Sequence, residues 1–159
     1  GSDIVLKKVT KGAVAKTIIK SVNKAKDAGY IMSCMVILGL GGKKYSKEHI
    51  SGTAEVISAC SPNYVGALTL YLENGIKQEF IDKYEGEFVK INDDEGLEEL
   101  YELVNQINTK EEIVFRVNHG SNAYTVKGTF PQDKQEMLEK VEWMKDHPEI
   151  VRPQGIRGF

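Results

Sequence analysis

Hydrophobic positions along this chain follow two different periods in turn. Between residues 15 and 28 they recur at helical spacing, lysines occupy the opposite face, and Gly29 follows as a helix stop. The next segment, residues 30–38, is a nearly continuous apolar run, which is typical of a parallel strand covered on both faces. This change of pattern predicts a helix followed by a strand.

The same alternation continues to the end of the chain. Helices are predicted at residues 3–9, 15–28, 46–60, 78–84, 93–107 and 131–146. Strands are predicted at residues 30–38, 64–70 and 113–117, with a polar loop at 118–128 and a loose tail at 148–159. Strands that alternate with helices form parallel βαβ units with right-handed crossovers. Three clear strands are too few for a closed eight-stranded barrel. We therefore expect one α/β domain over residues 1–159, with three or four parallel strands.

Three loops follow the predicted strands, and parallel α/β folds bind their ligands at such C-terminal strand ends. They are residues 39–44, 70–75 and 118–128. The first begins with Gly39-Leu40-Gly41-Gly42, where the backbone can approach a ligand closely and the next helix N-terminus favours an anion. The turn forms neither a dinucleotide fingerprint with a later acidic residue nor a P-loop. It is therefore either an anion site or a tight turn at the end of a strand.

Asn118-His119-Gly120-Ser121-Asn122 is a second polar constellation, and Arg116 precedes it. An imidazole at this place could exchange protons near neutral pH. Alternatively, the amides and the hydroxyl could bond to the backbone of their own loop. No nearby acid, cysteine or second histidine completes a triad or a metal site, so no catalytic residue and no metal ligand is assigned. His49 and His147 are expected at helix surfaces.

Composition narrows the function classes further. The chain has 159 residues, of which 41% are hydrophobic and 28% charged, and its formal charge is −2, so no basic excess favours a nucleic-acid surface. The acidic clusters 93–95 and 98–99 are interpreted as solvated helix starts.

Apolar runs such as 31–40 are too short to span a bilayer, and no signal peptide is expected. Cys34 and Cys60 lack a cluster-binding spacing and are expected to be buried, in a reducing, cytoplasmic location.

Several short runs of sequence occur in a distinctive order and spacing. They are residues 1–9 with 11–13, 26–29, 36–42, 46–49, 114–122 and 127–134. Together they resemble the C-terminal half of the barrel of radical S-adenosylmethionine (SAM) enzymes. The run Val36-Ile37-Leu38-Gly39-Leu40-Gly41-Gly42 is similar to the fifth strand of that barrel and its turn. The resemblance covers nearly the whole chain and implies a partial (β/α) barrel with parallel strands.

Enzymes of this family bind SAM across the strand ends and hold a four-iron four-sulfur cluster with a Cys-x-x-x-Cys-x-x-Cys loop. The cluster donates an electron, SAM is cleaved, and the 5′-deoxyadenosyl radical abstracts a hydrogen atom from the substrate. The resemblance implies that Ser2 lies near the ribose or methionine end of SAM and that Ile37 packs on adenine, edged by backbone of residues 65–70. The residues implied at the cofactor site are Ser2, Ile37, Gly39, Gly41, Gly42, Val65 and Leu68. Those implied on the substrate side are Arg116, Asn118, His119, Ser121 and Asn122.

The cluster-binding cysteine motif is absent from this sequence. We therefore expect the C-terminal part of a longer enzyme, whose partner is the missing N-terminal half of its own chain. SAM and the 4Fe-4S cluster are expected in the full-length parent, acting on a small-molecule substrate, and this part alone is expected to bind neither tightly and to be inactive. The alternatives are a non-catalytic α/β binding or scaffold domain with a degenerate barrel, and a phosphate-ligand binder that uses the glycine turn. Because strand 30–38 would lie at an uncovered sheet edge, we also expect self-association.

Overall fold

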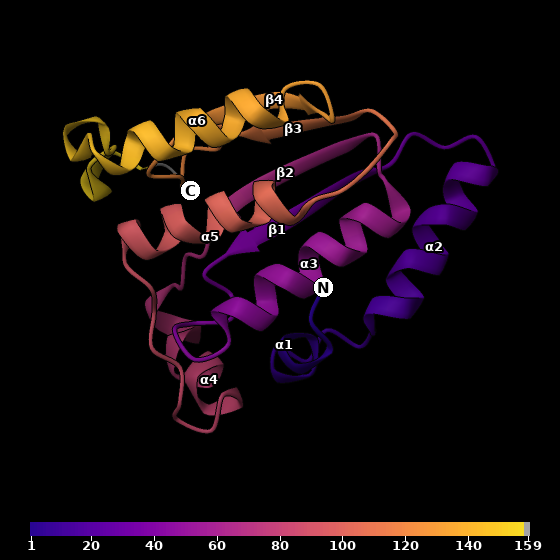
Figure 1. Ribbon diagram of the computed structural model, residues 1–159. Coiled ribbons are helices and arrows are strands. Elements are labelled where there is room, and N and C mark those ends of the chain that lie inside the picture. The colour runs from indigo at the N-terminus through magenta and orange to yellow at the C-terminus, as the bar shows by residue number, and fades with distance from the viewer. Residues whose placement is uncertain (158–159) are drawn as a thin grey trace.

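A four-stranded sheet forms the centre of the structure, a computed structural model that describes residues 1–157 (Figure 1). Its strands lie side by side in chain order: β1 (Ser33–Leu38), β2 (Tyr64–Thr69), β3 (Ile113–Val117) and β4 (Val126–Phe130). The first three run parallel, and β4 pairs antiparallel with β3. The predicted α/β class is therefore confirmed, and the sheet is open, with three parallel strands and one antiparallel strand at its edge.

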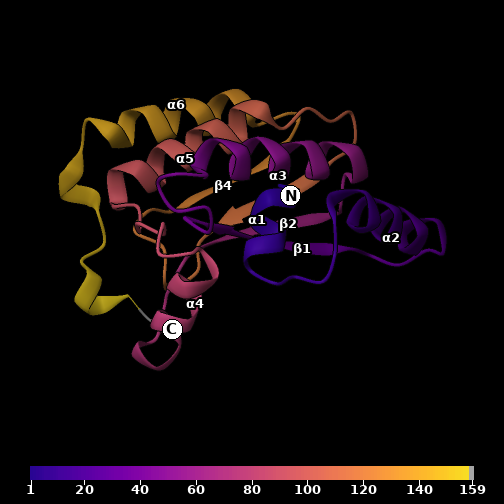
Figure 2. The same cartoon turned by 90° about the horizontal axis from the view of Figure 1, so that it is seen from below.

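The helices connect the strands, and three of them cover one face of the sheet. They are α1 (Asp3–Lys8), α2 (Ala15–Asp27), α3 (Ser46–Cys60), α4 (Asn74–Lys83), α5 (Asp93–Gln106) and α6 (Lys134–Lys145), followed by the short 3-10 helices η1 (Pro148–Ile150) and η2 (Gln154–Ile156). Helices α3, α5 and α6 form one layer against the sheet, and α2 lies beside α3 (Figures 1 and 2). Within residues 1–157, no helix is long and apolar enough to cross a membrane.

The two faces of the sheet have different surroundings because successive side chains of a strand point to opposite faces. Val36, Ala67 and Phe115 point into the main core with α3, α5 and α6, and each is at most 6% exposed. The other face, called the open face below, lies away from these three helices (Figure 2). Its residues are Ser33, Met35, Ile37, Tyr64, Gly66, Leu68, Val114, Arg116, Lys127 and Thr129. On this face Met35 is 59% exposed.

The segment after β3 differs from the prediction. The sequence predicts a polar loop through residue 128 and a helix from Pro131, whereas the structure forms β4 and begins α6 at Lys134. Only Val126 and Phe130 of β4 are fully buried, and the three residues between them are polar or glycine. So short an alternation is not distinguishable from a polar loop by its pattern alone. The strand forms because it pairs with β3 and buries its two ends in the core.

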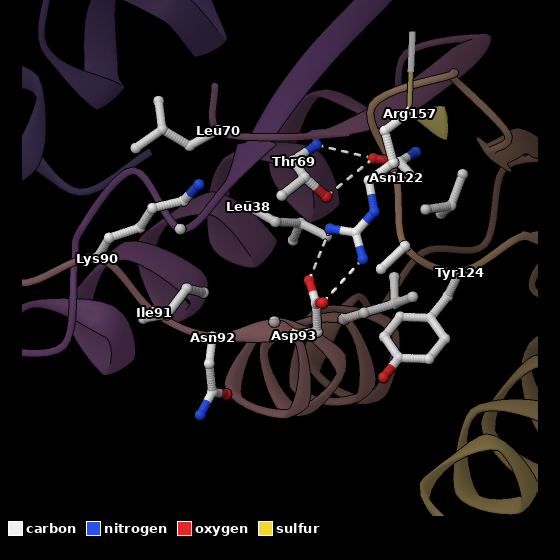
Figure 3. A pocket seen from close by; sticks show the side chains of 15 residues that line it. Leu38, Thr69, Leu70, Lys90, Ile91, Asn92, Asp93, Asn122, Tyr124 and Arg157 are labelled. Carbon is white, nitrogen blue, oxygen red and sulfur yellow. Dashed lines mark hydrogen bonds and ion pairs between the residues drawn. The ribbon is translucent and has the colours of Figure 1, made fainter. Parts of the chain in front are cut away.

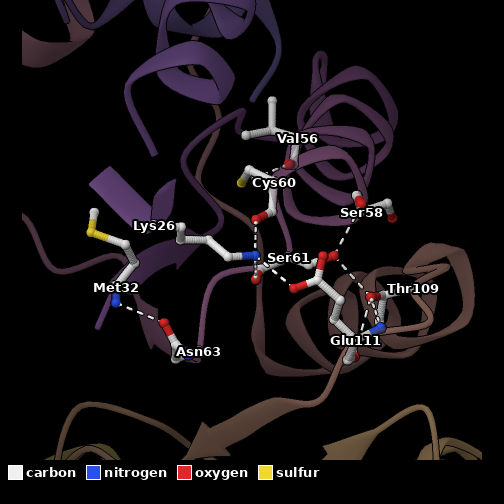
Figure 4. Close-up of polar contacts among 9 residues, drawn as sticks. All are labelled: Lys26, Met32, Val56, Ser58, Cys60, Ser61, Asn63, Thr109 and Glu111. Atoms are coloured by element: carbon white, nitrogen blue, oxygen red, sulfur yellow. Dashed lines mark hydrogen bonds and ion pairs between the residues drawn. The ribbon is translucent and has the colours of Figure 1, made fainter. Parts of the chain in front are cut away.

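A lysine fastens α2 to the C-terminal end of α3 (Figure 4). Lys26 Nζ donates hydrogen bonds to the carbonyl oxygens of Cys60 at 3.0 Å and Ser61 at 2.6 Å. It also forms an ion pair of 2.8 Å with Glu111, in the loop before β3. A helix leaves its last carbonyl groups without partners inside the helix. Lys26 supplies such a partner and at the same time joins three separate segments.

Candidate functional site

A cavity of about 280 Å³ lies at the C-terminal ends of β1, β2 and β3, where the predicted ligand loops converge (Figure 3). Leu38, Leu70 and Leu100 give it an apolar wall. Thr69 and Asn122 line it from the sheet side, and the first turn of α5 closes it from the other. The cavity therefore occupies the end of the sheet at which parallel α/β folds bind ligands.

The C-terminal tail reaches this cavity through Arg157, which sequence reasoning missed. The guanidinium donates two hydrogen bonds of 2.8 Å to the carboxylate of Asp93, at the start of α5 (Figure 3). Its Nε donates to the carbonyl oxygen of Arg152, and the side chain of Arg157 is only 7% exposed. A paired guanidinium and carboxylate of this geometry is among the stronger ionic contacts. No local pattern could have joined Arg157 to Asp93, because the two are 64 residues apart.

Asn122 ties the β3–β4 loop to β2. Its Oδ1 accepts from the backbone N–H of Thr69 at 2.7 Å and from the Thr69 hydroxyl at 3.1 Å, and its Nδ2 donates to Ala67 O at 2.8 Å. β3 pairs with β2 only as far as Gly66, so the Asn122 amide continues the ladder where β3 departs. The side chain is buried, and its polar atoms are engaged with the protein. Asn122 therefore positions the loop.

His119 and Ser121 bond to each other within the same loop. The backbone N–H of Ser121 donates to His119 Nδ1 at 3.2 Å, and the Ser121 hydroxyl lies 2.9 Å from the same nitrogen. Because Nδ1 accepts from the backbone, a neutral ring carries its proton on Nε2. Ser121 is buried, whereas His119 and Asn118 are exposed. The arrangement is the local loop bonding that the sequence left open as one of its two interpretations.

The glycine turn after β1 is occupied by an internal carboxylate. Glu99 of α5 accepts from the Gly39 N–H at 2.6 Å and from the Ser46 hydroxyl at 2.7 Å. The prediction that Glu99 belongs to a solvated cluster is wrong, because its side chain is buried beside this turn. Burial raises the pKa of Glu99, while the two hydrogen bonds act in the opposite direction.

The other glycines of the turn lie close to protein atoms. A Cβ at Gly41 would lie 2.5 Å from the carbonyl oxygen of Tyr45, and one at Gly42 would lie 2.9 Å from the ring of Phe88. Gly42 also has a φ of +58°, a conformation that other residues adopt only with strain. These two glycines therefore make room for neighbouring protein groups.

His49 is buried at 3% exposure, so the prediction of a surface histidine is wrong. Its Nε2 lies 2.8 Å from Ile37 O at the edge of β1, which makes Nε2 the donor, and Nδ1 has no hydrogen-bond partner within the described chain. Burial lowers the pKa of His49 to about 4. The sequence did carry a sign of this burial, because His49 lies at helical spacing in a second buried stripe of α3. The stripe consists of His49, Thr53, Val56 and Cys60.

The residues implied at the SAM site fall on both sides of the sheet. Ile37 and Leu68 are Cα partners in the register and are half-buried neighbours on the open face. Val65 points to the core side and is 1% exposed. Ser2 precedes α1 as its N-cap and packs against Gly52 of α3, where a Cβ would lie 2.7 Å from Ser2 N. The structure thus brings Ile37 and Leu68 together and leaves Val65 to act only through its backbone.

Arg116 lies on the open face, two positions before the polar loop. Its NH1 donates to the carbonyl oxygens of Phe115 at 2.7 Å and Gly128 at 3.1 Å. The side chain is half-buried. It is separated from His119 and Ser121 by the end of β3, so the implied substrate residues divide into Arg116 on the sheet and the rest on the loop.

Side chains that ligate metals do not gather in groups of three or more anywhere in residues 1–157. Cys60 is buried and its pKa is raised to about 11 by burial, whereas Cys34 is only half-buried and its pKa is raised for the same reason. The prediction of two buried cysteines therefore holds for Cys60 alone.

Comparisons of the chain with protein-family models, with curated proteins and with solved structures found no match.

Proposed function

We propose that this chain is the C-terminal part of a radical SAM enzyme, in which it contributes the adenine and ribose side of the SAM site and part of the substrate pocket. The observation that carries the proposal is the pairing of Ile37 with Leu68 on the open face, near the C-terminal ends of two parallel strands. Ligands of parallel α/β folds bind at that end of the sheet. Ile37 packs on one side against the cluster of Leu70, Tyr84 and Phe88, and Leu68 beside it extends this apolar surface, on which a flat ring can pack.

The one-sided helix layer supports a partial barrel as the finer architecture. In a (β/α) barrel the helices form the outer ring, and the opposite face of each strand points inward. Helices α3, α5 and α6 all lie on one side of the sheet (Figure 2). The open face is then the inward face of the proposed barrel, and it carries Ile37, Leu68 and Arg116.

The residues fit one end of SAM and not the other. Ile37 and Leu68 suit adenine. The resemblance assigns Ser2 to the ribose or methionine side, and in this structure Ser2 is buried against Gly52 of α3. The cluster supplies the electron that cleaves SAM, and its motif needs three cysteines where this chain has only Cys34 and Cys60. The proposal therefore assigns the cluster ligands to another part of a longer, cytoplasmic parent protein. This chain alone then binds SAM weakly and is inactive, because association costs outweigh a few apolar contacts.

A non-catalytic scaffold domain is the second candidate, and the geometry of the glycine turn favours it. The Gly39 amide is bound to Glu99, and Gly41 and Gly42 face protein atoms. A turn filled in this way can be purely structural. The same contact argues against a phosphate site at the turn, because the Gly39 N–H already donates its hydrogen bond to the Glu99 carboxylate.

The test is to express the gene that encodes this segment at its natural length and to purify the protein without oxygen. We expect a brown protein with bound iron that releases 5′-deoxyadenosine from SAM after reduction. Leu68→Arg should lower this release at least about tenfold, because a charge on the adenine floor must be desolvated. Ile156→Arg, at an exposed apolar residue of η2, is the matched control and should leave it unchanged.

A gene product without the cysteine motif would refute the proposal, as would one that holds a cluster and does not cleave SAM. Either result would favour the scaffold domain. Thermal unfolding of both variants, compared with the parent protein, checks that Leu68→Arg acts on the site and not on the fold.

A further inference from the structure

One row of residues crosses the open face from edge to edge. Met35, Gly66, Arg116 and Lys127 are successive Cα partners in the sheet register. The backbone N–H of Val114 bonds toward β2, and because the direction alternates along a strand, the backbone of Arg116 also points toward β2. Arg116 and Lys127 are therefore a non-hydrogen-bonded pair of the antiparallel ladder between β3 and β4. Side chains approach most closely in pairs of this kind. Two cationic side chains therefore leave directly opposite backbone positions on the same face of the sheet.

No residue in the described range 1–157 forms an ion pair with either of these cations, Arg116 or Lys127. Like charges directly opposite one another destabilise a sheet. The adjacent rows of the open face contribute Val114, Thr129 and Leu68, none of which is acidic. The pair is thus a cost to the sheet that a bound anion would remove.

Arg116 is already held in place for such a ligand. NH1 is fixed by the carbonyl oxygens of Phe115 and Gly128, and the remaining guanidinium nitrogens bond to no described residue. A guanidinium fixed at one nitrogen loses little freedom on binding, and its planar fork matches the oxygens of a phosphate or carboxylate. Lys127 is exposed and adds a second, mobile positive charge.

The other half of the row is apolar and shallow. A Cβ at Gly66 would lie 2.8 Å from Met35 Sδ and from Met35 Cε, so the thioether lies over the glycine. Met35 remains 59% exposed, and Tyr64 in the neighbouring row is 47% exposed. A flexible thioether beside an aromatic ring adapts to apolar groups of different shapes. The row therefore changes from apolar to cationic along its length.

We propose that this row binds a small phosphate monoester that carries an apolar group. The phosphate lies between Arg116 and Lys127, and the apolar group lies against the Met35 thioether that covers Gly66. A phosphate monoester is close to doubly negative at neutral pH, which matches the two cations. As a statement about the substrate class of the enzyme, this inference rests on the proposed function. As a binding site, it depends only on the open face.

The test is a titration of this chain, followed by the amide signals of a two-dimensional NMR spectrum. The probes are phenyl phosphate, inorganic phosphate, benzoate and phenol, each added alone and without SAM. We expect saturable shifts at residues 64–68, 114–117 and 126–128, with phenyl phosphate the tightest and phenol without effect. Inorganic phosphate binding as tightly as phenyl phosphate would overturn the apolar half of the site, and shifts outside these strands would overturn the whole.

Matched variants separate the site from general charge. Lys127→Met and Arg116→Met should each weaken phenyl phosphate at least about tenfold, because each removes a charge-assisted contact. Lys140→Met, an exposed lysine of α6, removes the same charge elsewhere and should have no effect. Equal affinities for Lys127→Met and Lys140→Met would contradict the inference even if Arg116→Met fails to fold. Because SAM is absent, a failure here leaves SAM cleavage by the natural-length protein to be judged separately.

Discussion

Two buried ionisable side chains hold β1 and the turn that follows it. Glu99 accepts from Gly39 and Ser46, and His49 donates to Ile37 O. Both are 3% exposed, and burial disfavours the charged form of each. The pKa of Glu99 is therefore raised and that of His49 is lowered to about 4. The same physical cause gives the two residues opposite effects on stability as the pH falls.

We expect His49 to make the protein less stable in mild acid. In the unfolded chain its pKa is near the ordinary 6.5, so between that value and about 4 the unfolded state binds the proton more strongly. The contribution of neutral His49 to the free energy of unfolding is thus fully present above pH 6.5. It is lost progressively as the pH falls from 6.5 to about 4. A shift of this size corresponds to about 3 kcal/mol in the free energy of unfolding. Urea unfolding at a series of pH values measures it.

The variant His49→Gln isolates this effect. Glutamine does not titrate, so the difference in free energy of unfolding between the two proteins should change across this pH range. The difference cancels the contribution of Glu99, whose raised pKa makes protonation favour the folded state. His147→Gln replaces a histidine just after α6 and is the matched control variant. A constant difference between the parent and His49→Gln would show that His49 does not titrate as proposed.

At the scale of elements, regular spacing and clear stop signals made the long helices predictable. The helix expected at 46–60 is α3 with the same bounds, and the strand expected at 113–117 is β3. Elements that depend on distant pairing were less predictable. β4 has two core residues and forms because β3 lies beside it, and α4 begins four residues earlier than the helix predicted from residue 78.

The candidate site was predictable to the same extent. Ends of parallel strands meet at one edge, so the convergence of the loops after β1, β2 and β3 follows from the alternating pattern. The internal partners of those loops do not. Glu99 reaches Gly39 from 60 residues away, and Arg157 reaches Asp93 from 64. Such contacts depend on packing in three dimensions, of which a single sequence carries no local sign.

The junction of α2 with α3 gives a prediction at this scale. Lys26→Met removes the donor for the carbonyl oxygens of Cys60 and Ser61 at the end of α3 (Figure 4). We expect a loss of about 1–3 kcal/mol in the free energy of unfolding, because a charged hydrogen bond to these carbonyls is lost. The surface ion pair with Glu111 contributes little of this. Lys24→Met, at an exposed lysine of the same helix, is the control, and an equal loss in the two variants would contradict the role of Lys26.

At the scale of the molecule, β1 leaves one edge of the sheet without a neighbouring strand within residues 1–157. The carbonyl oxygens of Met32 and Leu38 accept hydrogen bonds from the β2 segment. The backbone groups of the odd-numbered residues between them therefore point toward the free edge. His49 covers the carbonyl of Ile37, but Ser33 and Met35 have no backbone partner in the described chain. An edge of this kind is a template for strand pairing.

We expect this edge to cause self-association. Exposed apolar side chains extend the edge, with exposures of 69% for Tyr30, 75% for Ile31 and 59% for Met35. At roughly 25 cal/mol per Å² of buried apolar surface, a contact of a few hundred Å² contributes several kcal/mol. Light scattering should show a mass that rises with concentration in the micromolar range. Met35→Lys places a charge on the edge and should shift the protein toward monomer, whereas Ile156→Lys should not. A strict monomer at high micromolar concentration would exclude association through this edge, and equal association of both variants would move the contact to another surface.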